Sequence, residues 1–180
     1  MKFKYKPEIL TVSGNYFRFD DVENSTFTIK DIAHALSHIG RYTGHTSVFY
    51  SVCEHSVRAS YVVPAEHALA ALMHDSSEAF LGDVSSPLKA ILTEYKMIEE
   101  YVEEAILKRF GLPFPMHPEI KKADLIMLAT EKRDLMPKSN EWDVLKGVNP
   151  LPDTIYPWTS GWAKMMFLDR YEELTKEKSC

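Results

Sequence analysis

A histidine and two carboxylates lie close together in a stretch of chain rich in Ala, Leu and Met. They are His74, Asp75 and Glu78, and on a helix their side chains would point to one side. Burying such groups without partners is costly, and a metal ion would remove that cost, because imidazole nitrogens and carboxylate oxygens are metal ligands. The His-Asp dipeptide alone is weak evidence, since an ion pair at a helix end explains many such pairs. Further ligands are therefore needed from other parts of the chain.

Two other residues raise the same question. His55 lies in the sequence Cys-Glu-His-Ser, and Asp124 lies in Lys-Ala-Asp-Leu on a later helical segment. The neighbours of Asp124 include Ala123, Leu125 and Ile126, an apolar setting in which an unpaired carboxylate would be costly. Both residues are therefore candidates for a buried polar site.

In chain order, His55, His74-Asp75 and Asp124 resemble the H…HD…D signature of the HD-domain phosphohydrolases. The similarity is collinear over a motif core of about residues 29–133. Within that family, the chain resembles the branch with 5′-deoxynucleotidases and phage deoxynucleoside triphosphate hydrolases, including dATP triphosphohydrolases. The motifs that carry this resemblance are Arg41-Tyr42-Thr43-Gly44-His45, Ser51-Val52-Cys53-Glu54-His55-Ser56, Leu72-Met73-His74-Asp75-Ser76-Ser77-Glu78-Ala79 and Gly82-Asp83-Val84-Ser85-Ser86-Pro87-Leu88-Lys89.

The resemblance implies a metal site made by His55, His74, Asp75 and Asp124. Two imidazoles and two carboxylates suit one divalent transition metal, with Zn, Co or Mn expected, and Mg in addition if the substrate is a triphosphate. Such a metal would lower the pKa of bound water and polarise the phosphorus centre of a phosphate ester.

The resemblance also implies roles for residues around the metal. Glu78 would orient or deprotonate the attacking water, and Asp83 would assist or protonate the leaving oxygen. Arg41 would hold the phosphate through its planar guanidinium. Lys89 and Lys121 would contact additional phosphates, although either side chain could equally belong to an ordinary helix surface.

Several neighbouring residues have simpler interpretations beside the functional one. Tyr42 would stack on the base of a nucleotide or pack against the protein. His34 and His38 are one helical turn apart, but the resemblance places the ligands elsewhere, so we interpret them as partly buried or surface histidines. Glu54 is expected to be solvated, and Trp142 is expected to anchor the core or an interface.

The pattern of apolar residues predicts an all-α fold, a single compact HD-domain bundle of about six helices spanning residues 1–180. The first ~27 residues differ, and the turn signal Ser13-Gly14-Asn15 predicts a short hairpin or irregular arm between Thr11 and Asp21. Helices are predicted at about 28–40, 47–63, 65–80, 93–110 and 118–137, with a last helix after Trp158.

Composition narrows the class of protein. The chain has 180 residues, of which 45% are hydrophobic, but no apolar run long enough for a transmembrane helix and no apolar core of a signal peptide. The net charge of -5 argues against a nucleic-acid-binding module. Cys53 and Cys180 are poorly placed for a structural disulfide, which fits a cytoplasmic protein.

Together, these features predict a metal-dependent phosphohydrolase that acts on a small-molecule deoxynucleotide in nucleotide-pool control. A monophosphate would give deoxynucleoside and phosphate, and a triphosphate would give deoxynucleoside and triphosphate. Related proteins commonly self-associate, so a homo-oligomer is expected. An HD-type phosphodiesterase, an alarmone hydrolase and a non-catalytic nucleotide-sensing protein are ranked lower, because Arg41, Glu78 and Asp83 are present together and no appended synthetase or regulatory domain is recognisable.

Overall fold

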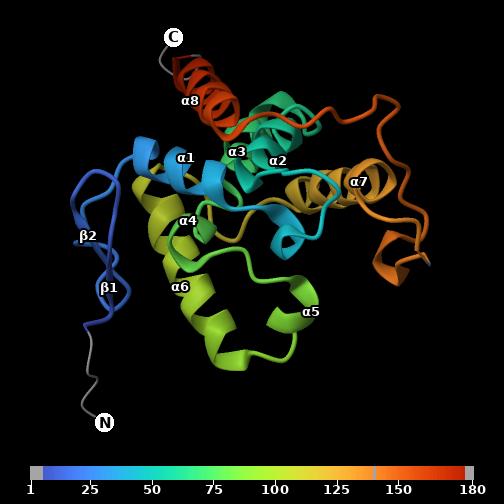
Figure 1. Cartoon of the computed structure of the whole chain (residues 1–180). Coiled ribbons are helices and arrows are strands. Elements are labelled where there is room, and N and C mark those ends of the chain that lie inside the picture. Colours follow the sequence, from blue (N-terminus) through green and yellow to red (C-terminus); the bar gives the residue numbers. More distant parts are fainter. Residues whose placement is uncertain (1–5, 140, 177–180) are drawn as a thin grey trace.

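Helices dominate the computed structural model, which describes residues 6–139 and 141–176 (Figure 1). The expected all-α architecture is therefore confirmed. Among the described residues, none of the helices combines the length and apolar character needed to cross a bilayer. The helices are α1 Ile29–His38, η1 Arg41–Gly44, α2 Val52–Ala59, η2 Ala65–His67, α3 Ala68–Met73, α4 Glu78–Leu81, α5 Ser86–Lys89, α6 Thr93–Arg109, α7 Pro118–Leu135, η3 Asp143–Leu145 and α8 Ser160–Lys176, where η marks a 3₁₀ helix.

A two-stranded antiparallel hairpin precedes the helices, as predicted, although it begins slightly earlier than expected. Strand β1 Glu8–Leu10 pairs with β2 Tyr16–Arg18, and Ile9 lies opposite Phe17. The ring of Phe17 is fully buried and stacks on Phe80 of α4 with 3.8 Å between ring centroids. This contact attaches the hairpin to the helical body.

Helix α2 occupies the centre of the molecule, in contact with α1, α3, α7 and α8 (Figure 1). Every residue from Val52 to Val57 has no exposed surface. The interpretation of Glu54 as a solvated side chain is therefore wrong: its carboxylate accepts hydrogen bonds from Arg58 Nε at 2.9 Å and from the Trp158 backbone N–H at 2.7 Å. A helix with so little exposed surface can carry buried polar groups only where partners satisfy them, which makes α2 a candidate to carry a site.

The chain breaks the helix that was predicted over residues 65–80. Helix α3 ends at Met73, and α4 begins at Glu78. Between them, Ser76 N donates to Met73 O and Glu78 N donates to Asp75 O. Each of these hydrogen bonds joins residues that are three apart, which makes the turn tighter than a turn of α-helix. His74 and Asp75 therefore lie in a turn at the end of a buried helix. The long helices α6 and α7 agree closely with their predicted bounds.

Candidate metal centre and active site

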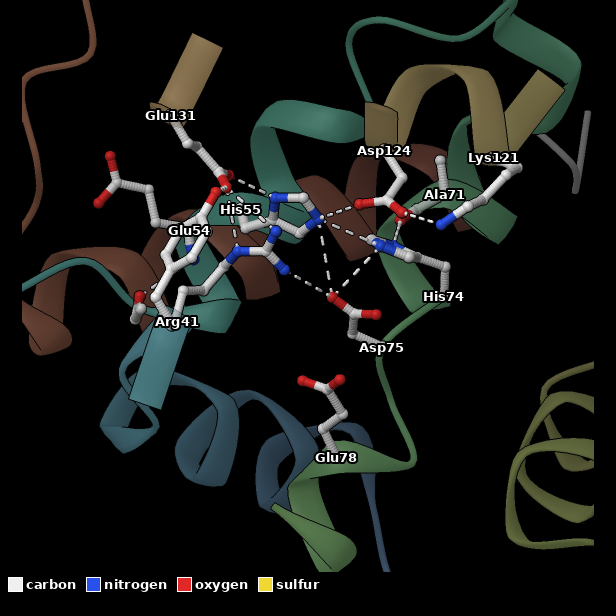
Figure 2. A network of polar contacts seen from close by, with 12 residues as sticks. Arg41, Glu54, His55, Ala71, His74, Asp75, Glu78, Lys121, Asp124 and Glu131 are labelled. Carbon is white, nitrogen blue, oxygen red and sulfur yellow. Dashed lines mark hydrogen bonds and ion pairs between the residues drawn. The ribbon is translucent and has the colours of Figure 1, made fainter. Parts of the chain in front are cut away.

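Side chains from three parts of the fold converge on one point in the interior. His55 comes from α2, His74 and Asp75 from the turn after α3, and Asp124 from α7 (Figure 2). The Nε2 atoms of His55 and His74 are 3.2 Å apart, and Asp124 Oδ1 lies 3.4 Å from His55 Nε2. One ligand atom from each of His55, His74 and Asp124 lies within 4.8 Å of the others. The fold thus brings together the four residues that the sequence singled out.

Both imidazoles turn Nε2 toward this point and have an acceptor at Nδ1. His55 Nδ1 lies 2.6 Å from Glu131 Oε1, and His74 Nδ1 lies 2.7 Å from the carbonyl oxygen of Ala71. These acceptors assign the proton of each neutral ring to Nδ1, which leaves a lone pair on Nε2. Two lone pairs that face each other repel unless a cation lies between them. A proton on His55 or a metal ion at the Nε2 side would remove that repulsion.

Asp75 supplies a second indication of a metal. Its Oδ2 atom is buried and has no hydrogen-bond partner among the described residues. That oxygen lies 3.2 Å from His74 Nε2 and 3.7 Å from His55 Nε2. Arg41 Nη1 forms an ion pair with this oxygen at 3.6 Å but no hydrogen bond, and a cation closer to the oxygen would supply the missing contact. Two nitrogens and two carboxylate oxygens are a donor set that suits a divalent transition metal.

Glu131 of α7 is a buried carboxylate that the sequence analysis did not identify. It has no exposed surface and accepts from His55 Nδ1, from Tyr42 Oη at 2.7 Å, and from Arg41 Nε and Nη2 at 3.2 and 3.0 Å. Burial opposes ionisation, but Arg41 and His55 outweigh it and lower the pKa of Glu131 to about 2. Glu131 thus orients the imidazole of His55, a candidate ligand, as outer carboxylates in metal sites commonly do.

The electrostatics around His55 favour a positive charge at its ring. Burial and Arg41 act to lower the pKa of His55, yet Glu131 and Asp124 raise it to about 9. For Asp124, burial is likewise outweighed by the hydrogen bond and charge of His55, which hold the pKa of that carboxyl far below its usual range. A metal ion at Nε2 would supply the positive charge while Nδ1 stays bonded to Glu131.

Arg41 lies beside the candidate ligand Asp75, but much of its guanidinium is already engaged. Its Nε–Nη2 edge is bonded to Glu131, and Nη1 lies 3.6 Å from Asp75 Oδ2 (Figure 2). A phosphate can therefore be approached from the Nη1 end and not from the edge that Glu131 occupies. The phosphate-holding role of Arg41 stays a prediction with this restriction.

The segment that carries Arg41 is strained. Tyr42 and Thr43 have φ values of 56° and 54°, a region that a β-branched residue seldom adopts. Such residues cost about 1–3 kcal/mol each and persist where the surroundings hold them. Here, Arg41 N donates to Tyr50 O, and the Tyr42 hydroxyl is bonded to Glu131. The strained turn therefore places the Tyr42 ring beside the site.

Glu78 and Asp83, predicted to handle protons, line the larger cavity together with the candidate ligands Asp75 and Asp124. Burial, followed by the charges of Asp75 and Asp83, raises the pKa of Glu78 well above its ordinary value. Its Oε2 atom is buried and has no hydrogen-bond partner among the described residues. Burial also raises the pKa of Asp83, which follows Gly82 with a φ of 80°. Glu78, whose carboxylate points toward Asp75 (Figure 2), is therefore placed to hold a proton beside that candidate ligand.

Lys89 and Lys121 are near the site, but each already has an acidic partner. Lys89 Nζ contacts Glu99 and lies 3.5 Å from Glu78 Oε1. Lys121 Nζ lies 2.7 Å from Asp124 Oδ2, and its side chain is 70% exposed. Neither lysine therefore offers an unneutralised charge for a phosphate chain.

Two cavities open onto the same group of side chains. The larger has a volume of about 910 Å³ and is lined by Arg41, Tyr42, Asp83 and Trp142, among others. The smaller, of about 270 Å³, is lined instead by residues such as Glu99, Glu103 and His117. Both are bounded by Asp75, Glu78, Lys89, Lys121 and Asp124. The larger volume is within the range of small-molecule sites.

Comparisons with known proteins identify the family of this chain. A family model described as 5′-deoxynucleotidase YfbR-like matches residues 15–136. The chain is 43% identical over 175 residues to the uncharacterized protein YfdR of Escherichia coli, covering 96% of this chain and 98% of that protein. It is also 35% identical over 122 residues to an uncharacterized protein of Rhodobacter capsulatus, covering 62% of each. The region matched by the family model contains the four candidate ligands and Glu131.

Proposed function

This chain belongs to the YfbR-like family of HD-domain phosphohydrolases, and from that premise we propose that it hydrolyses the 5′-phosphate ester of deoxynucleoside monophosphates, releasing deoxynucleoside and phosphate. The observation that carries the proposal is the convergence of His55, His74, Asp75 and Asp124 beside the buried, unpartnered carboxyl oxygen of Glu78. The family implies a divalent metal, and the donor set and tautomers fit one.

The four ligand candidates would hold the metal. When bound, the metal would act as a Lewis acid on the phosphate and lower the pKa of water. The protein side chains supply the rest of the chemistry. Glu131 holds His55 in the tautomer that leaves Nε2 free, and the Ala71 carbonyl does the same for His74. This arrangement orients both rings before any ligand binds.

Proton transfer is assigned to Glu78. Its Oε2 lacks a hydrogen-bond partner among the described residues, and its raised pKa favours holding a proton taken from water. Asp83, which lines the larger cavity, would assist at the leaving oxygen. The Nη1 end of Arg41 would contact the phosphate while its other edge remains bonded to Glu131.

The charges around the site support a monophosphate over a triphosphate. A triphosphate adds negative charge that needs several cationic partners. Lys89 and Lys121, the candidates for that role, are ion-paired with Glu99 and with Asp124. The smaller cavity beside the site carries further carboxylates, among them Glu103. A longer phosphate chain would therefore meet acidic groups and paired lysines.

The test is an end-point and steady-state assay with each deoxynucleoside mono- and triphosphate, in the presence of Zn, Co, Mn or Mg, with products separated by chromatography. Release of inorganic phosphate from the monophosphates, lost in His74→Ala and in Glu78→Gln, is expected. His38→Ala is the matched control, because His38 is an exposed histidine on α1.

Three outcomes would overturn the proposal. Triphosphate release from deoxynucleoside triphosphates, without monophosphate turnover, would transfer the activity to the other substrate class. Hydrolysis of only cyclic or 3′-pyrophosphorylated nucleotides would indicate a phosphodiesterase or alarmone hydrolase. Metal and nucleotide binding without any turnover would indicate a sensing protein.

A further inference from the structure

The larger cavity is lined by charged, polar and apolar side chains. Its charged groups include Asp75, Glu78 and Arg41, which already have proposed roles in metal binding, proton transfer and phosphate binding. Besides His45 and several small side chains, the lining includes the aromatic and aliphatic residues Tyr42, Leu125, Leu128, Met136, Trp142 and Val144. The proposed function places only the phosphate in this cavity, and a volume of about 910 Å³ exceeds what a phosphate needs.

Trp142 is the largest of these apolar side chains and precedes η3, a short helix that packs on α7. Its ring centroid lies 6.2 Å from that of Tyr42, with Lys132 Nζ 5.4 Å from the indole centroid. A cation lies equally close to the Tyr42 ring, with Arg41 5.4 Å from its centroid, but the Tyr42 hydroxyl is also bonded to Glu131, which makes Tyr42 less available to a ligand. Trp142 is thus the aromatic side chain best placed to meet a ligand.

The position of Trp142 in the chain is also informative. Residues 15–136 match the family model, whereas Trp142 and Val144 lie beyond that match. The side chains that would handle metal, proton and phosphate thus lie inside the matched region, and this apolar wall is completed from outside it. A part of the cavity wall that lies outside the family match is suited to determining which ligand this chain prefers.

We propose that Trp142, with Val144 and Leu128 beside it along the cavity, forms the subsite for the nucleobase of the substrate. This inference rests on the proposed function, which places the phosphate of the substrate, and it adds a place for the base. Stacking on an indole uses the face of the base and accepts every base, but it is stronger for the larger purines. The subsite therefore tolerates all bases and favours purine over pyrimidine deoxynucleotides.

The first experiment compares a substrate that has a base with one that lacks it. Steady-state KM and kcat are measured for dAMP, dCMP and 2-deoxyribose 5-phosphate with the wild-type protein and with Trp142→Ala, Trp142→Phe and Trp162→Ala. Trp162 is the matched control, because it is a tryptophan on α8 that is 51% exposed and does not line the cavity.

Loss of stacking should raise the KM of Trp142→Ala for dAMP about 10- to 100-fold and for dCMP by less, with kcat changed little. The KM for 2-deoxyribose 5-phosphate should stay within about twofold of wild type, and Trp142→Phe should recover most of the loss for dAMP. An equal rise in KM for the abasic substrate, or no rise for dAMP, overturns the base subsite.

A binding measurement separates this inference from the proposed function. Deoxyadenosine, which has no phosphate to hydrolyse, is titrated into the wild-type, Trp142→Ala and Trp162→Ala proteins while tryptophan fluorescence is recorded. Quenching that disappears only in Trp142→Ala supports the subsite even if no phosphate ester is hydrolysed. Hydrolysis of deoxynucleotides, combined with nucleoside binding that is equal in all three proteins, overturns the subsite and leaves the proposed function standing.

Discussion

Replacing Glu131 with Gln should weaken metal binding without changing any direct ligand. The substitution keeps the length of the side chain but removes the negative charge and turns one acceptor oxygen into an N–H donor. In the structure, both oxygens accept: Oε1 faces His55 Nδ1 at 2.6 Å, and Oε2 faces Arg41 and Tyr42. In the Gln variant, the new N–H donor must therefore face either His55 or the Arg41 and Tyr42 donors.

The magnitude follows from these contacts. Loss of an outer carboxylate behind a ligating histidine typically reduces metal affinity about 10- to 100-fold, or roughly 1.4–2.8 kcal/mol. Breaking a buried ion pair by removing one partner costs about 3 kcal/mol or more of folding stability. Arg41 keeps a second acidic partner, Asp75, at 3.6 Å, so its charge is not left unpaired. We therefore expect the loss in folding stability to be at the lower end, about 3 kcal/mol. For a chain of this size that lowers Tm by roughly 6–12 °C.

The assay is a metal titration against a competing chromophoric chelator, performed well below the Tm of each variant. Glu54→Gln is the matched control, because Glu54 is also fully buried and ion-paired, with Arg58, but does not contact the imidazole of His55 (Figure 2). It should lose stability and keep its metal affinity within about twofold. The reasoning is refuted if Glu131→Gln binds metal as tightly as wild type, or if both variants lose affinity equally.

Three further predictions concern groups around the site. Burial and the neighbouring charges of Glu99 and Asp75 raise the pKa of Glu103 from 4.5 to about 7. Because the folded protein holds this proton more tightly than the unfolded chain, the stability linked to Glu103 is fully present below pH ~4.5 and is lost as the pH rises through 7. Urea unfolding of Glu103→Gln should therefore match wild type near pH 4 and show a gain of up to about 3 kcal/mol near pH 8. An unchanged difference between pH 4 and 8 would contradict this. Glu78→Gln should lower kcat about 10²- to 10⁴-fold while metal titration remains as in wild type, and retention of kcat would exclude Glu78 from proton transfer. Lys121→Ala should change Tm and monophosphate KM only slightly, because its ion pair is exposed, and a large rise in KM would show that this lysine binds phosphate.

The candidate metal ligands could be predicted from the sequence, because the type and order of His55, His74, Asp75 and Asp124 carry a recognisable signature. Glu131 could not, because it stands in the charged run Glu-Lys-Arg-Asp, which is typical of a solvated helix surface. One signal was available: Glu131 follows Asp124 by seven residues, so the two carboxylates share a face of a helix.

Long helices were easier to predict than breaks in them. The bounds of α6 and α7 follow from apolar periodicity and from Gly and Pro at their ends. The turn at residues 74–77 has no such signal, since its residues also suit a helix, and only the packing of α3 and α4 shows it. Likewise, the burial of Glu54 depends on helices that surround α2 from distant parts of the chain.

Helix α7 approaches the imidazole of His55 at both ring nitrogens. Glu131 bonds Nδ1, and Asp124 faces Nε2 from two turns earlier on the same helix. Because one rigid helix carries both contacts, α7 and α2 should separate in a single cooperative opening. Metal addition should therefore slow amide hydrogen exchange in α2 and α7 by the same factor, whereas the hairpin of β1 and β2, which holds none of these contacts, should exchange at an unchanged rate.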